Sequence, residues 1–149
     1  METIFTLSNL FVLPFWALMI FLPHWRWTQR IMRTLWPVVV LAGVYTVLLL
    51  TQIGGVAGSL LNPTLDGIAG LLGTPAGAAV GWVHFLAFDL FVGRWAYLDS
   101  RERGISAWLV SPTLFFVFMA GPFGLLLYLA VRWLSQRQRG QNKLKEANR

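Results

Sequence analysis

Apolar side chains fall in four long runs along this chain, and each run is close to the length that a membrane-crossing helix needs. The runs cover about residues 4–22, 35–50, 77–98 and 108–133. A helix of roughly 20 apolar residues crosses the hydrocarbon core of a bilayer. The runs show no sustained alternation of apolar and polar positions, as a barrel strand would, so the pattern favours helices. We therefore predict an all-α membrane protein with about four transmembrane helices.

A glycine-rich stretch, residues 53–75, separates the second run from the third, and Asp66 is its only charged residue. Within it, Asn62 followed by Pro63 is typical of a helix N-cap with proline at the first helical position. We expect a short interfacial or re-entrant helix there. An ordinary apolar linker lying on the bilayer surface is the alternative.

Residues 1–134 are expected to form one transmembrane domain, and residues 135–149 a basic tail exposed to solvent. In the fourth run, Pro122 follows Gly121 near the middle, where a proline removes a backbone donor and predicts a kinked helix. Such a kink either serves packing or bends the helix around a bulky ligand.

Composition agrees with a membrane protein, because 56% of the 149 residues are hydrophobic and only 12% are charged. The sequence contains no cysteine, so it offers neither disulfides nor thiolate metal sites. The net charge of +6 comes from the loops and the tail, and we expect no nucleic-acid partner. Positive charge on both faces leaves the membrane orientation open. Glu2, with no Lys or Arg, precedes the first run, so we expect neither a cleavable signal peptide nor a transit-peptide leader.

The third run contains the ionisable residues His84, Asp89 and Arg94. Ionisable side chains at membrane depth are costly and indicate functional sites. We expect Asp89 and His84 to donate and accept a proton, and Arg94 to stabilise a developing oxyanion. Their spacing of five residues turns successive side chains by about 140° around a helix, so they cannot form one stripe. A structural ion pair between Asp89 and Arg94, with His84 hydrogen-bonded for packing, explains the same residues.

Aromatic residues gather on the third and fourth runs, where they would form a slot for a polyene or a ring system. For any single phenylalanine, lipid-facing packing is the better explanation. His84 has an alternative use as an axial ligand to the metal of a bound tetrapyrrole. Because His24, the other histidine, lies in the first loop, no multi-histidine metal site is expected. The residues expected to contact a substrate are Trp82, Phe85, Phe88, Asp99, Pro122 and Tyr128.

The segment from Trp82 to Asp99 begins Trp-Val-His-Phe-Leu-Ala-Phe-Asp-Leu-Phe-Val-Gly-Arg-Trp. It resembles the signature of the abscisic-acid-deficiency membrane family, which is associated with neoxanthin formation in plants and algae. Residues 13–23 and 121–129 resemble that family's first and last helices. The resemblance implies conversion of violaxanthin to neoxanthin, an isomerisation in which an epoxide opens to an allene and a tertiary alcohol without net redox change. Without a plastid-targeting leader, the chain is expected to be a bacterial relative.

Three functions follow from these residues and this resemblance. The first is carotenoid (xanthophyll) metabolism in a bacterial plasma or photosynthetic membrane, with the chain acting as an epoxy-carotenoid isomerase. The second is a non-enzymatic pigment- or lipid-binding subunit of a photosynthetic complex. The third is a small proton-coupled transporter with His84 and Asp89 as its relay. The expected partners are membrane lipid, a carotenoid or a tetrapyrrole as bound pigment, and, for the second function, subunits of a photosynthetic complex.

Overall fold

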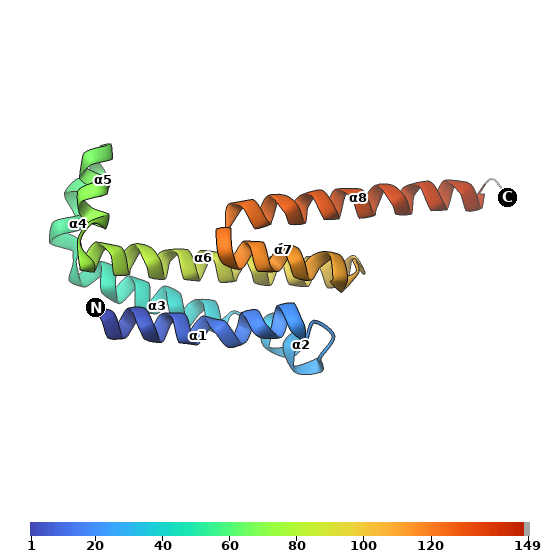
Figure 1. Ribbon diagram of the computed structural model, residues 1–149, viewed down its shortest axis with the longest axis horizontal. Coiled ribbons are helices and arrows are strands. Elements are labelled where there is room, and N and C mark those ends of the chain that lie inside the picture. Colours follow the sequence, from blue (N-terminus) through green and yellow to red (C-terminus); the bar gives the residue numbers. More distant parts are fainter. Residues whose placement is uncertain (148–149) are drawn as a thin grey trace. The chain divides into compact units, whose positions relative to one another are not determined.

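The protein is built from helices joined by short connections (Figure 1). The computed structural model describes the backbone of residues 1–147 and their side chains except at 55–56, 59–60, 139–140 and 142–147. No strand occurs among these residues, so the predicted all-α class is confirmed. The helices are α1 (Glu2–Phe21), α2 (Arg26–Arg33), α3 (Trp36–Thr51), α4 (Ile53–Leu61), α5 (Leu65–Leu72), α6 (Pro75–Glu102), α7 (Ala107–Ala120) and α8 (Pro122–Ala147).

Fewer helices can cross a membrane than the apolar runs predict. Within the described residues, α1 and α6 are each long and apolar enough, and α2 with α3 gives a third span if the two form one broken helix. The 14 residues of α7 rise only about 21 Å, which is less than the ~30 Å hydrocarbon core of a bilayer. The predicted count of about four spans is therefore too high.

The predicted single kinked helix over residues 108–133 is wrong. The first helix ends before Gly121, and α8 starts at Pro122 and runs back alongside α7 (Figure 1). Gly121 has φ 40°, which favours glycine, and proline cannot donate the hydrogen bond that would continue α7. A Cβ on Gly124 would collide with the backbone nitrogen of Val117, so the two helices of this hairpin touch backbone to backbone. Pro122 therefore begins a helix and does not kink one.

Close contacts divide the chain into two compact units. The first unit comprises Met1–Pro14 and Thr34–Leu90, and the second comprises Phe15–Arg33 and Phe91–Arg149. Helices α1 and α6 each contribute one part to each unit.

In the first unit, α3 packs against α6 through a small core of Leu48, Val80 and Val83. The start of α6 is fixed locally, because the Thr74 hydroxyl accepts a hydrogen bond from the Gly77 amide at 3.0 Å. Pro75 follows this cap as the first helical residue, where its missing N–H costs nothing.

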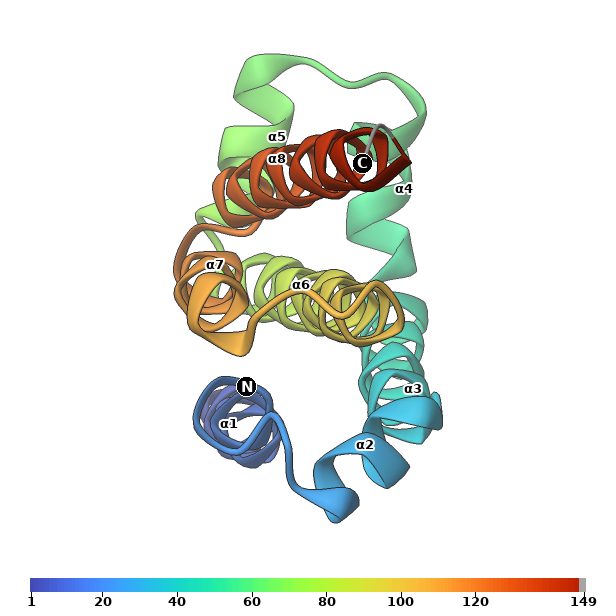
Figure 2. The same cartoon turned by 90° about the vertical axis from the view of Figure 1, so that its right-hand side faces the viewer.

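The glycine-rich stretch of the first unit forms two short helices, α4 and α5, joined by a loop (Figure 2). The expected short helix is present as α5, and its interfacial or re-entrant position stays a prediction. The N-cap of α5 is Thr64, whose hydroxyl accepts from the Gly67 amide at 3.1 Å, and not Asn62 as the sequence suggests.

In the second unit, α6 ends at a glycine cap. Gly104 has φ 57°, and the Ile105 amide donates to the Ser100 carbonyl oxygen at 2.8 Å. The Gly104 amide donates to the Arg101 carbonyl oxygen at 3.1 Å, which completes the pattern that closes helices at a left-handed glycine. The buried Ile105 covers this end, and the cap leaves Asp99 in the last turns of α6.

The predicted basic tail, residues 135–149, continues α8 as far as Ala147. Its Gln136, Arg137 and Gln138 are exposed. Most of the other tail side chains, including those of the remaining basic residues, lie outside the described residues.

Candidate functional site

His84 lies among aromatic rings in the first unit. Its ring centroid is 5.3 Å from that of Tyr45 on α3, and 4.6 Å and 6.1 Å from those of Phe88 and Phe85 on α6. Among the described residues, His84 has no hydrogen-bond or ion-pair partner. The packing role considered from the sequence, which required a hydrogen bond to His84, is therefore not formed.

Asp89 is partly buried on α6 in the same unit. Within the described part of the chain, its carboxyl group makes no hydrogen bond or ion pair, so the structural ion pair considered from the sequence is absent. Because His84 and Asp89 are five residues apart, their side chains leave the helix about 140° apart. An unpaired carboxyl group in an apolar helix is costly, and this keeps Asp89 a candidate for chemistry.

Arg94 belongs to the second unit. Its Nη2 donates to the carbonyl oxygen of Arg33 at 3.1 Å, a group at the end of α2. This hydrogen bond gives the guanidinium group a structural use, and its predicted contact with an oxyanion stays a prediction.

Trp82 connects α6 to α1 in the first unit. Its indole Nε1 donates to the Asn9 side-chain oxygen at 3.0 Å, and its ring centroid lies 5.5 Å from that of Phe5. The rings of Trp82, Phe85 and Phe88 are 41%, 56% and 58% exposed. These three predicted substrate contacts therefore reach the outer surface of the helix.

The second unit contains a cluster of charged and aromatic side chains, which we call the Asp99 cluster: Trp95, Asp99, Arg103, Tyr128 and Arg132. Arg103 Nε donates to both carboxylate oxygens of Asp99, at 2.9 and 2.8 Å. The Tyr128 hydroxyl donates to Asp99 Oδ2 at 2.6 Å, and Arg132 Nε lies 3.3 Å from the same oxygen. The Arg132 guanidinium also lies over the Trp95 ring, 5.7 Å from its centroid.

The Asp99 cluster brings together two predicted substrate contacts, Asp99 and Tyr128, which come from different helices. Both polar groups are already bonded to each other, and the Asp99 side chain is only 13% exposed. The cluster therefore links α6 to α8. Pro122, another predicted contact, lies at the first turn of α8.

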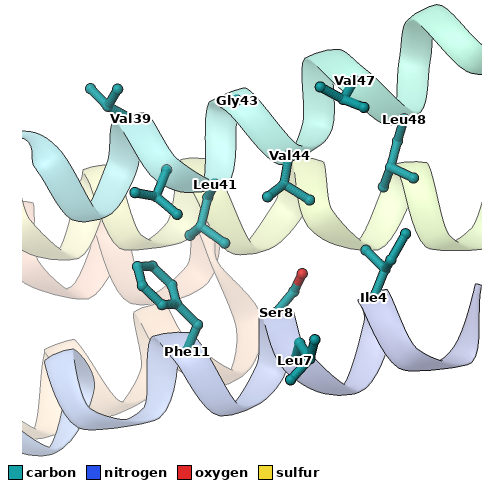
Figure 3. Close-up of a pocket in the computed structure, with 11 residues that line it drawn as sticks. Ile4, Leu7, Ser8, Phe11, Val39, Leu41, Gly43, Val44, Val47 and Leu48 are labelled. Carbon is teal, nitrogen blue, oxygen red and sulfur yellow. The ribbon is translucent and has the colours of Figure 1, made fainter.

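An apolar groove of about 610 Å³ lies between α1 and α3 in the first unit (Figure 3), and we call it the α1–α3 groove. Among the described residues that line it, Ser8 is the only polar one, and its hydroxyl points from α1 toward α3. A Cβ on Gly43 would meet no atom within 4 Å, so this position leaves part of the wall bare. The lining residues are Ile4, Leu7, Ser8, Phe11, Val39, Val40, Leu41, Gly43, Val44, Val47 and Leu48.

Comparison with known proteins identifies the family of this chain. A sequence model of the ABA DEFICIENT 4-like family matches residues 3–128, which include the whole α1–α3 groove and the Asp99–Tyr128 pair. The chain belongs to the ABA DEFICIENT 4-like family. The resemblance seen in residues 82–99 is therefore confirmed.

The chain is also similar to the chloroplastic protein ABA DEFICIENT 4 of Arabidopsis thaliana, with 30% identity over 110 residues. That alignment covers 70% of this chain and 50% of the relative, so the chain spans about half the length of the curated relative it matches. No solved structure matches the chain. The chloroplast relative and the apolar helices α1 and α6 agree with a membrane protein, and the bacterial setting stays a prediction.

Three residues of the Asp99 cluster, Trp95, Arg103 and Arg132, were not among the predicted site residues, although the sequence contains a signal for the two arginines. Arg103 follows Asp99 by four residues, and Arg132 follows Tyr128 by four, a spacing that puts each pair on one helix face. No comparable sequence pattern indicates the α1–α3 groove, because its apolar lining residues resemble those of any lipid-facing helix surface. The ABA DEFICIENT 4-like match ends at Tyr128, so Arg132 lies beyond it.

Proposed function

We propose that this member of the ABA DEFICIENT 4-like family binds a carotenoid in the membrane and isomerises an epoxide on it. The α1–α3 groove is the observation behind the proposal. A wall with Ser8 as its only polar residue suits an elongated hydrocarbon, whereas a polar ligand would lose hydrogen bonds to water there. The lining of α3 from Val39 to Leu48 runs about 14 Å along the helix, enough for part of a polyene chain.

The proposed reaction opens the epoxide to an allenic alcohol. The protonated carboxyl group of Asp89 gives its proton to the epoxide oxygen as a carbon–oxygen bond breaks. His84 removes a proton from a polyene carbon, and the electrons of that carbon–hydrogen bond form the second double bond of the allene. The substrate therefore neither gains nor loses atoms or electrons, and no oxidant is needed.

A non-enzymatic pigment-binding subunit is the second candidate function. It is favoured by the directions of His84 and Asp89, which leave α6 about 140° apart and share no hydrogen bond within the described residues. Such a protein would hold a carotenoid in the same groove and return it unchanged.

Binding is tested by expressing the protein in a host that makes violaxanthin, purifying it in mild detergent and extracting its pigment. A Cβ at position 43 meets no atom within 4 Å, so Gly43→Leu should place a larger side chain at the α1–α3 groove and lower the bound carotenoid on the order of tenfold, equivalent to about 1.4 kcal/mol. Gly70→Leu on α5 is the matched control, since it is also helical, has nothing within 4 Å and lies outside the groove. If the Gly43→Leu protein binds as much carotenoid as the wild type, the carotenoid does not bind in the α1–α3 groove.

Turnover is tested with Asp89→Asn, which keeps the size of the side chain and removes its acid. Because Asp89 has no partner in the described part of the chain, folded yield and bound pigment should persist. Allenic product should fall by about 100-fold or more, the usual effect of losing a general acid. Unchanged conversion would exclude Asp89 from the reaction. If the wild-type protein binds carotenoid and makes no product, the non-enzymatic pigment-binding function is supported in place of isomerisation.

A further inference from the structure

A second groove, of about 680 Å³, lies in the second unit between the end of α1 and the start of α7. We call it the His24 groove, because His24 lies in its lining among mainly apolar and aromatic neighbours. Phe115 and Phe116 of α7 line the groove, and so does Phe21 at the end of α1. The indole of Trp108, which also lines the groove, is 90% exposed. The lining thus combines a large apolar surface with one imidazole.

Hydrogen bonds fix the wall that contains His24. The Ser111 hydroxyl of α7 donates to the Ile20 carbonyl oxygen at 2.8 Å. The Tyr97 hydroxyl of α6 donates to the Pro23 carbonyl oxygen at 2.7 Å, and the Tyr97 side chain is almost completely buried. Because backbone groups on both sides of the α1 end are held by other helices, the groove is formed before any ligand arrives.

The contact with Arg101 sets the proton position on His24. Arg101 Nη1 lies 3.0 Å from His24 Nδ1. A guanidinium group can only donate, so Nδ1 accepts and the neutral imidazole has its proton on Nε2. The ring therefore offers an N–H donor to a ligand, and its orientation is held by Arg101.

We propose that the His24 groove binds the oxygenated end group of a xanthophyll, with a ring hydroxyl accepting a hydrogen bond from His24 Nε2. The inference rests on the proposed function for its ligand class and assigns the second unit its own site for an oxygenated ring. An end group of this kind combines an apolar ring, which fits against Phe115 and Phe116, with an oxygen that satisfies the imidazole donor. A carotene without oxygen would desolvate that donor and leave it unpaired.

The experiment compares two pigments with the same polyene, zeaxanthin and β-carotene, which differ in their ring hydroxyl groups. Each is titrated into the purified full chain in phosphatidylcholine nanodiscs, and binding is followed by induced circular dichroism in the visible range. The wild-type protein should bind zeaxanthin about five- to tenfold more tightly, the effect of one net hydrogen bond. His24→Phe keeps a ring but removes the donor and should abolish this preference. His24→Gln, which restores an N–H donor, should recover part of it.

Equal affinity of the wild-type protein for the two pigments would overturn the inference and leave the proposed carotenoid function intact. An unchanged preference in His24→Phe would do the same. If neither pigment binds and phospholipid is retained instead, lipid occupies the grooves, and both the inference and the proposed function fail. The wild-type comparison needs no variant, so the inference can be refuted even if a His24 variant does not fold.

Discussion

The carboxylate of Asp99 accepts hydrogen bonds from Arg103 and Tyr128 and lies within ion-pair distance of Arg132. These groups come from two helices, so a single side chain links the end of α6 to α8. Removing the charged groups from water opposes such a link. The link stabilises the protein only because the charged groups are hydrogen-bonded to one another. Removing one partner therefore lowers the free energy of unfolding by more than the intact pair contributes to it, because the remaining group is left buried without its partner.

At this scale we predict that Asp99→Asn destabilises the protein by about 2 kcal/mol, because two arginines lose their shared counter-ion. Thermal unfolding in detergent should show a midpoint about 5 °C lower. Tyr128→Phe removes one hydrogen bond and no charge, so it should lower the midpoint by less. If Asp99 instead serves mainly to contact substrate, Asp99→Asn would keep the wild-type midpoint and lose bound pigment.

At the scale of elements, the long apolar helices α1, α3 and α6 and the short helix α5 could be predicted from the sequence, whereas α2, α4 and the reversal at Gly121 could not. Apolar runs show where helices lie, because lipid selects the same side chains along the whole span. A glycine followed by proline precedes a kink as readily as a chain reversal. What decides between them is the close backbone approach of Gly124 to Val117, a tertiary contact. The two grooves escaped prediction for a similar reason, since their linings come from helices distant in sequence.

The α7–α8 hairpin gives a prediction at the same scale. A methyl group at position 124 would meet the backbone of Phe116 and Val117, which cannot move aside as a flexible side chain would. Gly124→Ala should therefore destabilise the protein by about 1–3 kcal/mol, seen as a lower unfolding midpoint and a smaller monodisperse fraction. Gly70→Ala, at a helical glycine with nothing within 4 Å, should leave stability unchanged or raise it by up to ~1 kcal/mol. Equal behaviour of the two variants would contradict the close approach.

On the scale of the whole molecule, large apolar side chains are exposed in both units. Leu65 in the first unit is 85% exposed, and Phe21 and Trp108 in the second are 77% and 90% exposed. Such side chains would drive association in water, whereas a bilayer solvates them. Together with α1 and α6, which are long enough to span, these side chains agree with a membrane protein. The reversal at Gly121 in turn determines on which side of the membrane the two ends of the fourth apolar run lie.

Because the natural sequence has no cysteine, single cysteines can report on which side of the membrane a residue lies. If α7 and α8 form a hairpin, Ser106→Cys and Gln138→Cys should react with a membrane-impermeant maleimide from the same side of sealed vesicles. A single kinked span over residues 108–133 would instead place them on opposite sides. Glu2→Cys and Arg26→Cys are the control pair, since they flank α1, which is long enough to span, and should label from opposite sides. Opposite labelling of both pairs would refute the hairpin, because a chain that reverses at Gly121 cannot deliver its two ends to different faces.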